Sequence, residues 1–128
     1  MAEKILQDTF KDELAFFSAG ISPIAKASMD PRSIEFLTES NINDVYHMPK
    51  KINNKMIENS DLVLAMDTNI LIELNKSFKK YMNKFKLFSY GQPTYNLSDP
   101  YKYSKDDYKE IMINVKKLSL NFRERFKI

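Results

Sequence analysis

The residues best suited to chemistry lie in the stretch YNLSDPYKY (residues 95–103), where one carboxylate, Asp99, precedes a proline and stands among tyrosines. Proline fixes its own φ angle and restricts the residue before it, so we expect Asp99 to be held in an extended conformation. A carboxyl group held beside flat aromatic side chains would suit the protonation of an aromatic leaving group. Asp-Pro pairs also begin ordinary turns, and a turn is the simpler interpretation of these residues alone.

Other kinds of chemistry have little support in the composition. The 128-residue sequence contains no cysteine, one histidine (His47) and two glycines. The lack of cysteine removes disulfides, thiolate metal sites and cysteine-based catalysis from this polypeptide. One histidine and two glycines argue against a histidine-rich metal site and a glycine-rich nucleotide loop. We therefore expect neither a metal nor a cofactor.

The overall composition is that of a soluble globular chain, with 43% hydrophobic and 29% charged residues. A chain of this length is expected to form a single domain over residues 1–128. No apolar run approaches the ~20 residues of a membrane span. The N-terminal residues MAEKILQDTF lack the apolar core of a signal peptide. These features predict a cytoplasmic protein without a membrane partner.

The net charge of +3 reflects 20 basic and 17 acidic residues. The basic excess clusters in one segment, at Lys76, Lys79, Lys80, Lys84 and Lys86. Such a cluster could contact RNA or phosphorylated partners, but a solvated helix face is the commoner explanation. No RNP-type aromatic motif, zinc-ligand spacing or glycine-rich loop accompanies it, so we expect no nucleic-acid partner.

The elements that must position Asp99 alternate between helices and strands. Apolar spacing predicts a first helix whose apolar face runs from Ala2 to Leu14, followed by a buried strand over 14–20. Asp30 and Pro31 are typical of a helix start. The other expected elements are a short helix over 54–59, a strand over 61–67, a helix capped by Asp67 or Thr68, a strand over 85–90, and a long helix from about 104 with apolar residues Tyr108, Ile111, Val115, Leu118 and Phe122.

This alternation predicts an α/β fold with a parallel sheet flanked by helices. The continuous apolar run at 61–67 is typical of a strand covered on both faces. In such sheets, ligands bind beyond the carboxyl ends of the strands. Gly20, Asp67 and the loop after Tyr90 follow those ends, so we expect the Asp99 loop at the same edge.

The order of four motifs resembles that of the low-molecular-weight protein-tyrosine phosphatases. The motifs are SAG (18–20), DPRSIEFL (30–37), LVLAMDTNI (62–70) and DPYKY (99–103). The resemblance implies that phosphotyrosine is hydrolysed through a cysteinyl-phosphate intermediate. In that family a C-x5-R-[ST] loop supplies the attacking thiolate, while its arginine and backbone N–H groups bind the phosphoryl oxygens.

The resemblance also implies roles for individual residues. Asp99 matches the general acid that protonates the departing phenolate, and Pro100 and Tyr101 match the residues that follow it. Tyr103 is displaced by one position from a second aromatic residue of the family, because Lys102 stands in that place. We expect Tyr101 and Tyr103 to contact the substrate, which would be a phosphotyrosine protein or a small aryl phosphate.

Two further residues match supporting positions of the family. Ser18 corresponds to a serine that hydrogen-bonds towards the nucleophile loop, and His47 corresponds to a histidine in the same surroundings. A lone surface or satisfied core histidine is the alternative interpretation of His47.

The nucleophile loop itself has no counterpart in these residues. In bacterial relatives the loop commonly continues as Arg-Ser-Pro-Met-Ala-Glu, and this chain begins Met1-Ala2-Glu3. The sequence therefore resembles a phosphatase shortened just past its catalytic loop, without the central first strand. We expect a three-stranded remnant of the sheet, in which the strands at 14–20 and 61–67 either leave a gap or close together. We expect no catalytic activity from the 128 residues alone.

Three alternatives remain open at this point. The chain could be a non-catalytic binding or regulatory module that acts through the basic segment 76–86, or a gene fragment without function. A relative of the thiol-dependent arsenate reductases, which share the fold, is disfavoured because those enzymes need several cysteines. Any self-association is expected to be weak.

Overall fold

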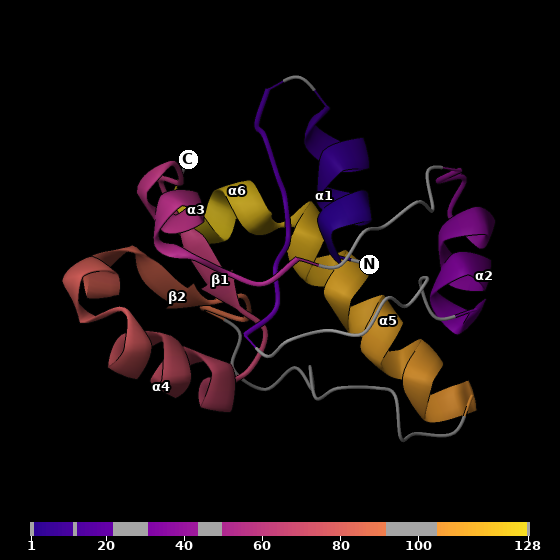
Figure 1. The fold of residues 1–128 in the computed structure, drawn as a ribbon. Coiled ribbons are helices and arrows are strands. Elements are labelled where there is room, and N and C mark those ends of the chain that lie inside the picture. The colour runs from indigo at the N-terminus through magenta and orange to yellow at the C-terminus, as the bar shows by residue number, and fades with distance from the viewer. Residues whose placement is uncertain (1, 12, 22–30, 44–49, 92–104, 128) are drawn as a thin grey trace.

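A computed structural model describes residues 2–11, 13–21, 31–43, 50–91 and 105–127. The elements are α1 (Ala2–Phe10), α2 (Pro31–Glu39), α3 (Asn54–Glu58), β1 (Val63–Ala65), α4 (Thr68–Ser77), the 3-10 helix η1 (Lys79–Lys84), β2 (Phe85–Leu87), α5 (Lys105–Leu120) and α6 (Phe122–Phe126). Figure 1 shows the two strands with α3 and α4 on one side of the molecule and α1, α2 and α5 on the other.

The two strands form a parallel pair, with Val63 opposite Phe85 and Ala65 opposite Leu87. The pairing extends beyond the strands, because the Phe88 N–H donates to the Ala65 carbonyl at 2.8 Å. Helix α4 and η1 make the crossover that a parallel pair requires. A small core of Ile57, Ala65, Leu74 and Phe85 joins α3 and α4 to the strands. The predicted α/β fold with a parallel sheet is confirmed.

The predicted strand over 14–20 is wrong, and with it the three-stranded remnant. The described residues contain a two-stranded sheet, and the stretch 14–20 joins no ladder apart from an isolated parallel bridge between Gly20 and Lys51. The Gly20 N–H donates to the Lys50 carbonyl at 2.7 Å, and the Gly20 carbonyl accepts from the Ile52 N–H at 2.8 Å. The backbone of 14–19 makes no backbone hydrogen bond to other described residues. A strand needs a paired neighbour along its length, and this stretch has none among them.

Capping side chains set the beginnings of two helices. Asp67, rather than Thr68, caps α4, because its Oδ1 accepts the Ile70 N–H at 2.8 Å. Asn53 caps α3 in the same way. The first helix is shorter than predicted: it ends at Phe10, because Lys11 adopts a left-handed φ of 40°.

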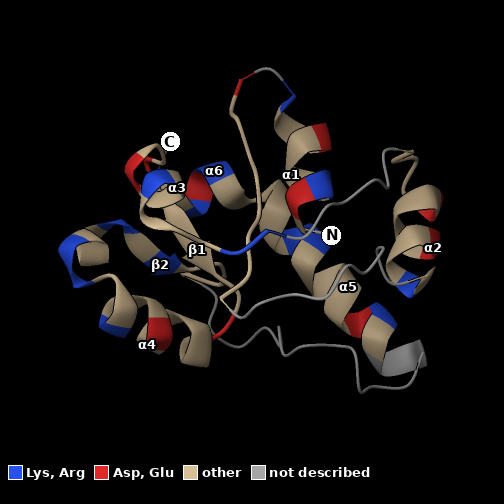
Figure 2. Cartoon of the chain, viewed as in Figure 1, with Lys and Arg blue, Asp and Glu red and all other residues tan. Residues whose placement is uncertain are grey.

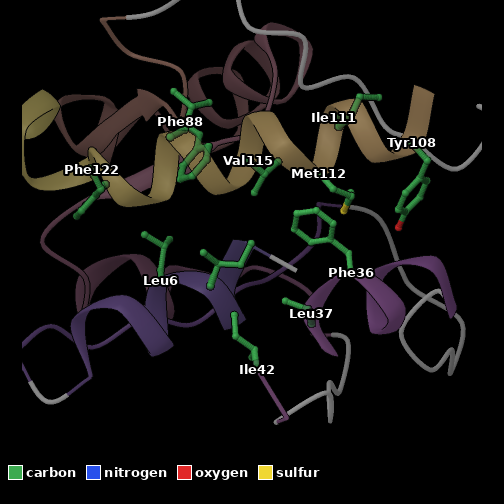
Figure 3. Packing of buried hydrophobic residues seen from close by; sticks show 12 residues of the cluster. Leu6, Phe36, Leu37, Ile42, Phe88, Tyr108, Ile111, Met112, Val115 and Phe122 are labelled. Atoms are coloured by element: carbon green, nitrogen blue, oxygen red, sulfur yellow. The ribbon is translucent and has the colours of Figure 1, made fainter. Parts of the chain in front are cut away.

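Helix α5 lies at the centre of the main core. Its buried apolar residues are Tyr108, Ile111, Met112, Val115 and Leu118, which include the predicted apolar stripe as far as Leu118. Figure 3 shows Tyr108, Met112 and Val115 pointing towards α1 and α2, which contribute Leu6, Phe36 and Leu37 to the same core. The stripe continues into α6, where the Phe122 ring lies 5.6 Å from the ring of Phe16. The stretch after α1 is therefore held by side-chain packing rather than by sheet pairing.

Arg125 ties α6 to the end of β2. Its guanidinium donates to the carbonyls of Phe88, Tyr90 and Leu118, the last two at 3.0 and 2.6 Å. Burial lowers the pKa of Arg125, although an arginine stays charged at neutral pH. Gly91 follows with a φ of 84°, a left-handed conformation that glycine adopts without strain. These contacts fix the point at which the chain leaves β2 for residues 92–104.

Candidate functional site

The edge of the sheet at which a ligand is expected is defined by the ends of β1 and β2. Because the strands are parallel, the residues after Ala65 and Leu87 emerge at the same edge. Asp67 lies there, but its carboxylate is engaged as the helix cap of α4. The exposed Tyr90 ring stacks on Phe126, with ring centroids 5.5 Å apart. The segment that contains Asp99 therefore starts at this edge, immediately after Gly91.

Most of the predicted site residues lie outside the described part of the chain. Asp99, Pro100, Tyr101 and Tyr103 belong to residues 92–104, and His47 belongs to residues 44–49. Their proposed roles stay predictions. The structure defines the anchors of the Asp99 segment, which connects Gly91 with the start of α5 at Lys105.

Ser18 is the predicted site residue that the structure does describe. It is half-buried, and its hydroxyl donates to the carboxylate of Glu3 in the first turn of α1. Gln7 lies one helical turn beyond Glu3, and its side-chain amide donates to Glu3 Oε1 at 3.2 Å and to the Phe16 carbonyl at 2.9 Å. Side chains of α1 thus hold the stretch that carries Ser18 at two points.

Glu3 and Gln7 are residues that sequence reasoning missed. Their spacing of four residues places both on one face of α1, and this spacing is the signal that could have identified them as a pair. A charged carboxylate can accept the Ser18 hydroxyl and fix its orientation.

We expect Ser18→Ala to lower the free energy of unfolding by about 0.5–1.5 kcal/mol, because a partly buried hydrogen bond is lost between segments distant in sequence. Urea unfolding followed by circular dichroism measures this loss. Ser77→Ala is the matched control, since the Ser77 hydroxyl donates to the Glu73 carboxylate at 3.0 Å on the exposed surface of α4. Equal losses in the two variants would show that the Ser18–Glu3 contact does not anchor the stretch.

The described residues contain no candidate metal site. No group of three or more His, Cys, Asp or Glu residues among them could hold a metal ion. A hollow of about 40 Å³ lies between α2 and α5, where the Arg32 guanidinium sits 4.0 Å from the centre of the Tyr108 ring. It is about the size of one water molecule and is lined by α2 and α5 residues, not by the carboxyl ends of the strands.

Among the described residues, no helix has the length and apolar character needed to cross a membrane.

The chain matches a known protein family over almost its whole length. A family model described as "Low molecular weight phosphotyrosine protein phosphatase" matches residues 1–127. The chain is 26% identical over 107 residues to the low-molecular-weight protein-tyrosine-phosphatase Wzb of Escherichia coli strain K12, an alignment that covers 84% of this chain and 72% of that protein.

Solved structures share the fold. The structure of Vibrio vulnificus Wzb in complex with benzylphosphonate is similar with a TM-score of 0.86 at 20% identity, over 96% of this chain and 86% of that one. A mutant of the YwlE arginine phosphatase with a phosphorylated active-site serine is similar with a TM-score of 0.82 at 26% identity, over 98% of this chain and 86% of that one. Because the family model spans almost the entire sequence, the chain belongs to the low-molecular-weight phosphotyrosine protein phosphatase family.

Proposed function

We propose that this chain carries the general-acid loop of a protein-tyrosine phosphatase, and that Asp99 is the general acid. The protonated carboxyl of Asp99 gives its proton to the phenolate oxygen as the bond from that oxygen to phosphorus breaks. The resulting carboxylate then accepts a proton from the water that attacks the phosphoenzyme. Tyr101 and Tyr103 are proposed to contact the aromatic ring of the substrate.

The observation that carries this proposal is the starting point of the Asp99 segment. Gly91 follows β2 at the carboxyl edge of the parallel pair, where ligands of α/β proteins bind. Arg125 holds this point through the carbonyls of Phe88 and Tyr90. A proton donor must lie within hydrogen-bond reach of the leaving oxygen, so a fixed anchor for its loop supports the role of Asp99.

We propose that the thiolate nucleophile is supplied by residues outside these 128, because this sequence has no cysteine. We propose that a strand bearing the C-x5-R loop pairs with the edge of β1 that faces away from β2. Two observations support a strand at this place. Val63 and Leu64 remain partly exposed although β1 is apolar, and the backbone of 14–19 has no backbone partner among the described residues. In Figure 1 the stretch 14–20 runs in the same direction as β1.

We expect the purified 128-residue chain to show no turnover of p-nitrophenyl phosphate, because it supplies neither the thiolate nor the phosphate-binding arginine of the loop. Release of p-nitrophenol measures this. If the purified chain turns over the substrate and its Asp99→Ala variant does not, the nucleophile lies within the 128 residues and the proposal is contradicted. An in-frame stop upstream of Met1, with no apolar strand and no C-x5-R loop before it, would contradict the proposed source of the nucleophile.

The substrate class has a second candidate. The chain is 26% identical to the solved structure of the YwlE arginine phosphatase mutant, besides being 26% identical over 107 residues to Wzb of Escherichia coli. Phosphoarginine is therefore the alternative to phosphotyrosine. A protein extended by its nucleophile loop should be assayed on matched peptides that carry each phosphorylated residue, and we expect the phosphotyrosine peptide to be preferred. Preference for the phosphoarginine peptide would replace this substrate assignment and leave the family assignment intact.

A further inference from the structure

The positive charge of the chain is concentrated on one surface that the proposed phosphatase reaction does not use. Residues 74–91 contain five lysines and no acidic residue. The rest of the chain has 15 basic and 17 acidic residues and so carries a net charge of −2. In Figure 2, blue marks η1 and the neighbouring parts of α4 and β2.

One of the five lysines has a structural role, and the other four are exposed, although Lys80 and Lys86 also lie over the rings of Tyr81 and Tyr90. Lys84 donates its ammonium hydrogens to the carbonyls of Ile57, Glu58 and Ser60, at 3.0, 3.3 and 2.9 Å. These bonds satisfy carbonyls at the end of α3. The other four lysines are exposed, and no carboxylate of the described residues pairs with any of them. They form what we call the lysine face: Lys76, Lys79, Lys80 and Lys86.

The lysine face is separate from the edge where the candidate catalytic site lies. Helix α4 and η1 lead into the beginning of β2, so most of the lysine face lies near the amino end of that strand. The Asp99 segment starts beyond the carboxyl end of the same strand, after Gly91. A partner bound to the lysine face would therefore leave the candidate catalytic edge open.

We propose that the lysine face binds an acidic segment of a partner polypeptide. Residues 74–91 contain no arginine, so this face lacks the rigid fork that recognises individual phosphates. Lysine ammonium groups are point charges on flexible stems, and they can follow carboxylates spread along a chain. An isolated ion pair at a surface is weak, but several lysines acting together on one acidic segment give affinity and fast association.

Two other polyanions fit the surface less well. A nucleic acid would need free aromatic faces on which bases stack, but the Tyr81 ring lies beneath the ammonium groups of Lys80 and Lys84, at 5.5 and 5.6 Å. The ring of Tyr90 is stacked on Phe126. A lipid surface would need a row of apolar anchors, and the large apolar side chains exposed on α4 and η1 are those of Ile72 and Met82.

The test is direct binding of a fluorescein-labelled oligoglutamate peptide to the 128-residue chain, measured by anisotropy at low and high salt. We expect binding that weakens with salt. Reversing the charge at Lys76, Lys79 and Lys80 to glutamate should weaken it by roughly 3- to 100-fold, since three exposed ion pairs are lost and each is worth roughly 1.4- to 5-fold.

The matched control reverses the same number of charges elsewhere, at three exposed lysines: Lys11, which follows α1, and Lys109 and Lys117 of α5. It should bind almost as well as the wild-type chain. An equal loss in both variants would show that net charge alone is responsible and would overturn the proposal. So would the absence of binding to oligoglutamate, or tighter binding to single-stranded RNA or to vesicles containing phosphatidylglycerol. None of these binding measurements depends on phosphatase activity. A negative result would therefore refute the lysine-face proposal without affecting the proposed phosphatase function.

Discussion

In a protein that includes the nucleophile loop, replacing Asp99 with alanine is expected to slow the release of a phenol leaving group by ~10²–10⁴-fold, the usual contribution of a general acid. The loss arises because a departing phenolate is a poor leaving group unless it receives a proton. Steady-state kinetics with a series of aryl phosphates whose phenols differ in pKa measures the effect.

The dependence on the leaving group distinguishes proton donation from a structural role. Phenols of low pKa leave without a proton, so their phosphates should lose much less activity than those of phenols with high pKa. Asp61→Ala is the matched control, because Asp61 is an exposed carboxylate before β1 at the opposite end of that strand. Equal losses across the series, or an equal loss in the control, would remove Asp99 from the role of general acid.

The sequence predicted the features that arise from local chemistry. The N-cap at Asp67 and the apolar stripe of α5 are both present, because capping and helical periodicity depend on residues close together in the chain. The strands at 61–67 and 85–90 exist with shorter bounds, at Val63–Ala65 and Phe85–Leu87. Strand ends are set by the length of the neighbour that pairs with them, and a single sequence does not contain that information.

The conformation of the stretch 14–20 depends even more strongly on whether a neighbouring strand pairs with it. LAFFSAG is rich in apolar and aromatic residues, and these favour a strand wherever a partner is present. The apolar side chains are used, since Leu14 and Phe16 pack against the main core. The backbone forms no ladder along this stretch, and side chains of Glu3 and Gln7 hold it instead. These contacts could not be predicted because they join α1 to a segment whose conformation the apolar pattern leaves undetermined.

The candidate site was predictable only through the order of its motifs. Asp99, considered alone, is a common turn residue, and the resemblance to a family gave it a chemical role. The structure adds the anchor at Gly91 and the contacts of Arg125. Arg125 could not be found from the sequence, because a charged residue near the end of an amphipathic helix ordinarily points to solvent.

Leu118→Ala is expected to lower the free energy of unfolding by about 2–5 kcal/mol, the second large effect that we predict. Leu118 is completely buried in α5, where that helix packs in the main core with α1 and α2. Its truncation removes apolar contacts and leaves a cavity that close-packed neighbours fill only in part. Whole domains are stable by only ~5–15 kcal/mol, so this single change removes a large share of the stability.

Leu120→Ala is the matched control, since it makes the same substitution in the same helix at a side chain that is 58% exposed. Its effect should stay within about 0.5 kcal/mol. Urea unfolding followed by circular dichroism gives both values. If Leu118→Ala does not fold, Ile111→Val and Ile113→Val repeat the comparison with the loss of a single methyl group. These side chains are 2% and 39% exposed. The buried change should then cost about 0.5–1.5 kcal/mol and the exposed one less. Equal costs within either pair would mean that the packing of α5 against α1 and α2 does not form the core of this protein.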